Sequence, residues 1–224
     1  MGCAAIVVAF LPGIFFRNNA AGGIEEYIEI LGFSFILLGQ LIRASSRGYK
    51  AEHSRESQAL IQAGPYQVVR NPMYLGILLI GLGVVLAVFK LWVAVIFLIV
   101  FVIRYILLIY KEEKKLLAVF PGAYREYCKK VPRILPSLSN LIKLDVVEYL
   151  PIKISWIKKE IGSILSLLFL TLLAESWEDI YREGVKAYLR QSLWLIFTFI
   201  LFIIFVALLS KRTGERDESN ADKS

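Results

Sequence analysis

Long apolar runs separated by polar segments dominate this chain. A bilayer core is about 30 Å thick, and a helix needs about 20 apolar residues to cross it, so uncharged runs approaching this size predict membrane helices. The clearest runs lie at residues 30–42, 74–89, 91–103 and 193–210. Two shorter runs, at 3–16 and 161–174, predict further spans that tilt or lie at the bilayer surface.

The pattern predicts an all-α fold, a polytopic transmembrane bundle of about five to six membrane helices. The two central runs meet near Lys90, which predicts a helical hairpin with a very tight turn. Lys and Arg gather in residues 43–70 and 111–159, and the positive-inside tendency places both segments on the cytoplasmic side. The prediction is therefore a multi-pass integral membrane protein with a pocket that opens toward the cytoplasm.

The polar segments divide the chain into regions. Proline and serine residues punctuate the stretch that follows the second basic segment, which favours a boundary near residues 137–150. Residues 152–161 mix lysines with isoleucine and tryptophan, which is typical of an interfacial helix. The predicted regions are N-terminal membrane helices (1–42), a central unit with the hairpin (43–136), C-terminal membrane helices (137–213) and a disordered tail (214–224).

Composition and charge agree with a membrane protein. Hydrophobic residues make up 57% of the chain and the mean hydropathy is +0.62, both above what soluble domains show. The net charge of +7 arises from cations that flank the apolar runs, and no nucleic-acid motif accompanies them. Cys3 and Cys128 form no disulfide pattern, and His53, in a predicted polar loop, is a poor metal ligand by itself.

One polar segment with candidate chemistry, residues 64–76, leads into the first helix of the hairpin. The proline that follows Asn71 holds it extended, and its side-chain oxygen is expected to cap the helix. Pro72 suits the first helical position because its missing N–H is not needed there. Free N–H donors and the positive end of the helix dipole would then favour a carboxylate or phosphate. The simpler alternative is a well-formed helix start without a ligand.

A second candidate segment, residues 111–133, follows the second helix of the hairpin. Adjacent helical residues point about 100° apart, so Glu112 and Glu113 are expected to differ, one facing a ligand and the other solvated or paired with lysine. Tyr124 and Tyr127 are three residues apart and are expected to share a face. The alternative is a cationic juxtamembrane helix whose glutamates balance its lysines.

Taken together, the two segments resemble the membrane methyltransferase superfamily that includes isoprenylcysteine carboxyl methyltransferases and phosphatidylethanolamine N-methyltransferases. The shared pattern is Gly-x-Tyr, Arg-His/Asn-Pro-x-Tyr-x-Gly, a hairpin, Glu-Glu, Tyr-x-x-Tyr and Val-Pro. In this chain the pattern is carried by Gly64, Tyr66, residues 70–76, Glu112, Glu113, Tyr124, Tyr127, Val131, Pro132 and Pro136. The resemblance covers about residues 58–136, and ordered, spaced motifs of this kind are more specific than either segment alone.

The resemblance implies a transferase that binds S-adenosylmethionine and methylates a lipophilic membrane substrate, without a metal. It implies cofactor contacts from Gln58, Ala59, Leu60, Ile61, Tyr66, Asn71, Pro72, Met73, Tyr74 and Glu112. The positive helix end suits the cofactor carboxylate, Glu112 can accept from its ammonium or ribose hydroxyls, and tyrosine faces favour its sulfonium. The choice of Glu112 over Glu113 comes from the resemblance alone.

Two departures from the family pattern bear on the acceptor. Many members have His where this chain has Asn71, and a neutral amide cannot act as a general base. Prenylcysteine methyltransferases have an Arg four residues before the first Glu, where this chain has Leu108. Arg104, one turn earlier, would serve only with a shifted substrate. Arg104 and Arg133, together with Arg70, are the candidates for steering an anionic acceptor, and Arg104, Arg133 and Glu112 form the predicted catalytic set.

Other readings remain open at this level. Sterol reductases of membranes share an Arg-x-Pro-x-Tyr-x-Gly helix and a Tyr-Cys-x-x-Val-Pro ending, which residues 127–132 match, and such a protein would bind NADPH. A non-catalytic membrane protein of the same fold would bind no cofactor. Glycines of the apolar runs, Gly32, Gly39, Gly76, Gly81 and Gly83, are predicted to be close-packing positions between membrane helices. The acceptor, the type of membrane and the oligomeric state are not specified by the sequence.

Overall fold

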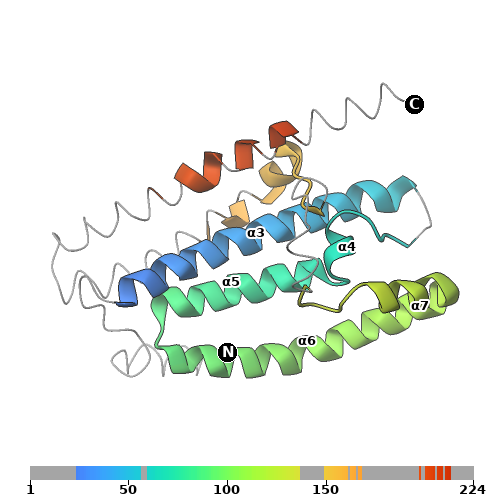
Figure 1. The fold of residues 1–224 in the computed structure, drawn as a ribbon, viewed down its shortest axis with the longest axis horizontal. Coiled ribbons are helices and arrows are strands. Elements are labelled where there is room, and N and C mark those ends of the chain that lie inside the picture. Colours follow the sequence, from blue (N-terminus) through green and yellow to red (C-terminus); the bar gives the residue numbers. More distant parts are fainter. Residues whose placement is uncertain are drawn as a thin grey trace.

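The computed structural model describes residues 24–56, 60–136, 149–160, 162–164, 166–167, 197, 200–204, 206–208 and 210–212. Regular structure in these residues is helical, with no β-strand among them, which confirms the all-α prediction. The helices are α3 (Ile24–Glu56), α4 (Pro65–Val68), α5 (Pro72–Val88), α6 (Leu91–Val119) and α7 (Pro121–Lys130) (Figure 1).

Helix α3 continues well beyond the apolar run that predicts it. The charged residues from Arg43 to Glu56 remain helical, because this stretch contains good helix formers and no proline. His53 lies in this helix, where its ring stacks on Tyr49 with centroids 3.9 Å apart. The prediction that His53 lies in a polar loop is therefore wrong.

Helices α3 and α5 pack closely through glycines at two levels. A Cβ on Gly32 would lie 2.7 Å from the Gly83 carbonyl oxygen, and a Cβ on Gly39 would lie 2.6 Å from the Gly76 carbonyl oxygen. Because Gly32 lies against Gly83 and Gly39 lies against Gly76, the two helices run antiparallel. This geometry confirms the predicted role of these glycines, since only a residue without a side chain permits such backbone contact.

The hairpin between α5 and α6 turns within two residues, Phe89 and Lys90, as predicted. Gly81 on α5 lies against the Phe97 ring on α6, so a glycine also allows close packing in the hairpin. The outer face of α6 is apolar and open, with Val95 58% and Ile103 61% exposed. A long apolar face of this kind is suited to lipid rather than to water.

Two of the described helical segments are long and apolar enough to cross a membrane, Tyr27–Ser54 and Leu91–Val119. Helix α5 is a shorter apolar helix of 17 residues. The predicted spans at 3–16, 161–174 and 193–210 lie wholly or partly outside the described residues, as do the boundary near 137–150 and the tail. The described residues therefore contain two candidate membrane helices, and the total of five to six spans stays a prediction.

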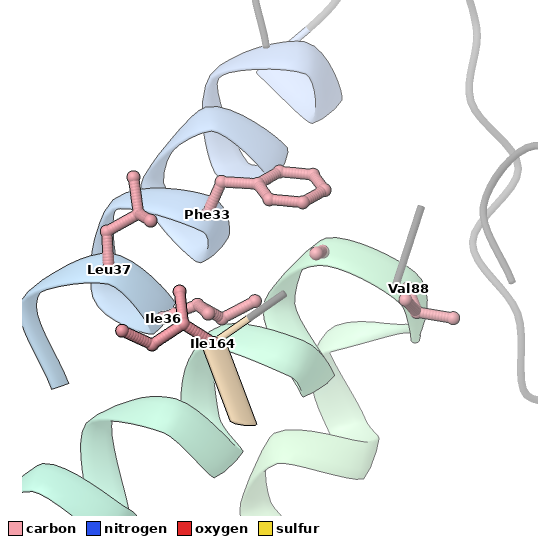
Figure 2. Close-up of a cluster of buried hydrophobic side chains, with 6 residues drawn as sticks. Phe33, Ile36, Leu37, Val88 and Ile164 are labelled. Atoms are coloured by element: carbon pink, nitrogen blue, oxygen red, sulfur yellow. The ribbon is translucent and has the colours of Figure 1, made fainter. Parts of the chain in front are cut away.

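A segment from the C-terminal half packs along α3 and completes the core. Residues 154–160 form a helix, in line with the helix predicted at 152–161. Ile164 packs with Phe33, Ile36 and Leu37 of α3 and with Val88 of α5 in one buried cluster (Figure 2). The core thus joins residues that are more than a hundred positions apart, and it supports one side of the α3–α5 pair.

Candidate functional site

The loop before α5 is held by the segment that follows α7. The Arg70 N–H donates to the Pro132 carbonyl oxygen at 2.8 Å, and the Asn71 N–H donates to the Arg133 carbonyl oxygen at 3.1 Å. Gly64 begins this loop with φ of 60°, a conformation that favours glycine. The beginning of α5 and the end of the motif region are therefore fixed together as one backbone unit.

Asn71 precedes α5 but does not cap it with its side chain. Its Nδ2 donates to the Arg133 carbonyl oxygen at 3.1 Å, and its backbone carbonyl accepts from Tyr74 and Leu75. Pro72 stands at the first helical position, as predicted. The predicted side-chain cap is wrong because the returning segment at Arg133 takes the amide. Most of the backbone N–H donors that were predicted to be free at this helix start already donate hydrogen bonds within the protein, and Pro72 has no N–H.

Glu113 is the glutamate that faces the interior. Its carboxylate lies 3.2 Å from Arg70 Nη1 and 2.7 Å from Arg133 Nη2, and Arg133 Nε makes a second contact at 3.1 Å. Its side chain is 12% exposed. Arg70 also contacts the Cys128 thiol on α7. Glu113 therefore joins α6, α7 and both ends of the motif region, with arginines where a lysine partner was expected.

Glu112 is exposed and faces the start of α5. The Tyr74 hydroxyl forms a side-chain hydrogen bond with Glu112. The pKa of the Tyr66 phenol on α4 is raised mainly by burial and, to a smaller extent, by the negative charge of Glu112. The Tyr66 phenol therefore stays neutral at ordinary pH. Glu112 thus binds Tyr74 and lies within electrostatic range of Tyr66, and the two adjacent glutamates differ in environment as their spacing predicts.

Tyr124 and Tyr127 of α7 form the buried support beneath this group. Each is 4% exposed, which confirms that they share a face, and their ring centroids are 6.1 Å apart. The Tyr127 hydroxyl donates to the Tyr66 carbonyl oxygen at 2.6 Å. Burial is the main cause that raises the pKa of both phenols. The Tyr-x-x-Tyr motif therefore positions α4 and does not face a ligand.

An aromatic row on α6, not anticipated from the sequence, borders the same group. Tyr105 lies against Tyr74 with centroids 5.4 Å apart, and Phe101 stacks on Tyr105 at 4.2 Å. Tyr105 precedes Glu112 by seven residues, about two helical turns, so both lie on a similar side of α6. That spacing was the signal that would have identified Tyr105. The row extends the polar site into the apolar part of the hairpin.

Several predicted residues lie elsewhere. Arg104 is on the exposed side of α6, in a groove of about 360 Å³ that Leu107, Leu108 and Lys111 also line. Gln58 and Ala59 fall outside the described residues, while Leu60 and Ile61 are half-buried in the chain before α4. The structure thus gathers Tyr66, Asn71, Tyr74 and Glu112, with Arg133 bound to Glu113, and it keeps Arg104 apart.

Comparison with known families gives this arrangement a context. The phospholipid methyltransferase family matches residues 28–122, a range that contains α3, α4, α5, α6 and both motif glutamates. This match covers less than half of the chain, and it agrees with the resemblance that the motifs carry. The matched family lies in the superfamily of isoprenylcysteine carboxyl and phosphatidylethanolamine methyltransferases, as the motifs predict.

The chain is also similar to one curated relative. That protein is the cobalt-zinc-cadmium resistance protein CzcN of Cupriavidus metallidurans, 26% identical over 83% of this chain and 84% of the relative. No solved structure matches the chain. Within the described part of the chain, no three His, Cys, Asp or Glu side chains gather in a way that would hold a metal ion.

Proposed function

We propose that this protein is a multi-pass S-adenosylmethionine-dependent methyltransferase that acts on a lipophilic acceptor, with its site at the cytoplasmic end of the hairpin. The observation that carries the proposal is the hydrogen bond between Glu112 on α6 and Tyr74, which lies in the first turn of α5. The reaction class is that of the phospholipid methyltransferase family, which matches residues 28–122. The cytoplasmic orientation of the site is inferred from the lysine- and arginine-rich segments around it.

The residues present suit the proposed cofactor. Glu112 is an exposed carboxylate, and it can accept hydrogen bonds from the cofactor's ammonium or ribose hydroxyls. Tyr74 and Tyr105 present aromatic faces that attract a sulfonium. Residues 58–61, Asn71, Pro72 and Met73 are proposed to complete the binding segment. When bound, S-adenosylmethionine supplies an activated methyl group.

The chain's own contribution to the reaction is alignment and exclusion of water. Methyl transfer from a sulfonium is an in-line displacement that needs no metal, and correct placement of the two reactants supplies much of the rate. Asn71 cannot accept a proton as a base, and its amide is occupied by the Arg133 carbonyl oxygen. A nucleophilic acceptor is therefore expected, one that reacts without proton removal at this position.

The lipophilic acceptor is proposed to approach along α6. Its outer face is apolar, and Arg104 provides a cation within that face. Arg104 is eight residues from Glu112, about 12 Å along the helix axis. An acceptor whose acidic group binds Arg104 must therefore extend toward the cofactor. Arg133, held by Glu113, is 47% exposed and provides a second cation beside Asn71.

A binding assay on the purified full chain tests the proposal. Labelled S-adenosylmethionine is expected to bind the wild-type protein, and Glu112→Gln is expected to weaken binding about tenfold because the charged acceptor is lost. Glu126→Gln on α7, also an exposed glutamate, is the matched control and should bind normally. Binding of NADPH in place of S-adenosylmethionine, or equal effects of the two variants, would contradict the proposal. Membranes incubated with methyl-labelled cofactor would then reveal the acceptor.

A further inference from the structure

A second cavity lies on a different side of α3 from the candidate site. Its volume is about 700 Å³, and it is bounded by the C-terminal part of α3 and by the helix at 154–160 with the residues after it. Figure 1 shows this golden segment beside α3. Small residues, Ala44, Gly48 and Ala51, line the α3 side, and Trp156 lies so close to Gly48 that a Cβ there would clash with its ring.

The two walls of this cavity run antiparallel. Lys153 pairs with Glu52 at 2.8 Å, and further along Glu160 pairs with Arg47 at 2.5 Å and Arg43 at 3.9 Å. The lining residues recur every four positions, which places them on one face of each helix. On α3 these are Arg43, Arg47 and Ala51, and on the C-terminal segment they are Ser155, Lys159 and Ser163.

Hydrogen-bond donors exceed acceptors in this cavity. Glu160 is 7% exposed and is the acidic partner of both arginines. A guanidinium carries five N–H donors, so a single carboxylate leaves most donors of Arg43 and Arg47 available. Lys159 is exposed and has no carboxylate partner in the described part of the chain. The cavity therefore offers cationic and hydroxyl donors that suit the oxygens of a phosphate group.

The depth of the cavity indicates the source of that phosphate. The uncharged run of α3 ends at Ile42, and Arg43 begins the cavity lining, so the cavity starts where apolar helix gives way to charge. This is the level of lipid headgroups, and basic pockets between membrane helices on the cytoplasmic side bind anionic headgroups. Below it, the apolar residues Leu41 and Ile152 are buried together.

The cavity is separate from the candidate methyltransferase site. Ser46 and Tyr49 of α3 face α4, since the Tyr66 hydroxyl donates to the Ser46 carbonyl oxygen and Gly64 lies against the Tyr49 ring. Arg47 and Ala51 face the C-terminal segment. No residue of the cavity lining belongs to the group around Glu112, so the two sites have no side chain in common.

We infer that this cavity binds the phosphate group of an anionic phospholipid through Arg43, Arg47 and Lys159, while Glu52, the second carboxylate of the lining, stays paired with Lys153. The lipid serves as a bound structural ligand between α3 and the C-terminal segment, and no chemical change of the lipid is involved. The phosphate binds Arg47 and Lys159 from opposite walls, which adds a bridge between them. The hydroxyls of Ser155 and Ser163 provide further donors.

Native mass spectrometry of the full chain tests this inference. The protein is reconstituted in phosphatidylcholine nanodiscs that contain phosphatidylglycerol, released, and examined for retained lipid of the phosphatidylglycerol mass. Arg47→Gln with Lys159→Gln is expected to lower that adduct about tenfold, because two charged contacts are lost. The matched control is Arg125→Gln with Lys158→Gln, which removes the same charges from exposed residues outside the cavity, and it should retain the lipid.

Arg47→Gln also breaks the ion pair with Glu160, so a loss of lipid in that variant could come from misfolding. A second variant separates the two causes. Ala51→Phe leaves every charge in place and fills the cavity, so it too is expected to lower the adduct about tenfold. Equal loss in the control variant, or full retention in Ala51→Phe, would overturn the inference. Displacement of the lipid by millimolar inorganic phosphate would also overturn it, because the cavity would then suit a soluble phosphate compound.

Discussion

Arg70 Nη1 lies 3.2 Å from the Glu113 carboxylate, and this contact joins the residue before the α5 N-cap to the C-terminal part of α6. Both side chains are nearly buried, 11% and 12% exposed. Because adjacent helical residues diverge by about 100°, the pairing of Glu113 leaves Glu112 on the open side of α6. The Glu-Glu motif thus contains one residue that stabilises the fold and one that is available to a ligand.

Glu113→Gln is expected to lower the free energy of unfolding by about 2–4 kcal/mol, because Arg70 would lose its countercharge in a nearly buried position. Glu112→Gln should change it by less than about 0.5 kcal/mol, since Glu112 is exposed. Denaturation in mixed micelles measures both values. Equal destabilisation by the two variants would mean that the roles of the glutamates are not divided in this way.

Tyr74→Phe is expected to weaken S-adenosylmethionine binding about tenfold, since it removes the hydroxyl that holds the Glu112 carboxylate. Tyr110→Phe is the control, because Tyr110 lies on the same helix as Glu112 and is 64% exposed. Equilibrium binding of labelled cofactor measures both. Unchanged affinity in Tyr74→Phe would show that this hydroxyl does not orient the binding carboxylate.

Gly39→Ala is expected to destabilise the fold by about 1–3 kcal/mol, because the added Cβ meets the α5 backbone at Gly76. Gly122→Ala makes the same change on α7, where a Cβ meets nothing within 4 Å, and it should stabilise slightly or have no effect. Thermal unfolding in detergent compares the two. Similar melting of Gly39→Ala and wild-type protein would contradict the close contact of α3 with α5.

Stability is expected to fall in alkali because of the buried tyrosines of α7. Burial raises the pKa of Tyr127 above its usual value near 10, so the folded protein holds this proton more tightly than the unfolded chain does. The resulting stabilisation is fully present below about pH 10 and decreases as the pH rises further. Unfolding measured from pH 8 to 11 should show the decrease, and Tyr127→Phe should reduce its slope. An unchanged slope in Tyr127→Phe would exclude this phenol as a source.

Periodicity predicted the local features well. The hairpin, its turn at Lys90 and the glycine contacts follow from apolar spacing and from the small size of glycine, which are properties of short stretches. The same reasoning separated Glu112 from Glu113. It failed at the end of α3, because His53 and the glutamates beside it, Glu52 and Glu56, were interpreted as a loop although they continue the helix.

Long-range contacts account for the remaining errors. The Asn71 cap was predicted from its immediate neighbours, but the Arg133 carbonyl oxygen, 62 positions away, takes the side-chain amide. The arginine partners of Glu113 and the approach of Tyr105 to Tyr74 likewise depend on how α5, α6 and α7 pack. Local sequence does not encode which distant backbone group will arrive at a polar side chain.

The two glycine levels between α3 and α5 restrict relative sliding of these helices. Each level inserts backbone into backbone seven residues from the next, so a small axial shift would drive Ile36 or Ile80 into the opposing chain. The two helices therefore form a rigid pair, and Asn71 lies at one end of it. Any movement that accompanies ligand binding is therefore expected in other parts of the protein, with this helix pair as their fixed reference.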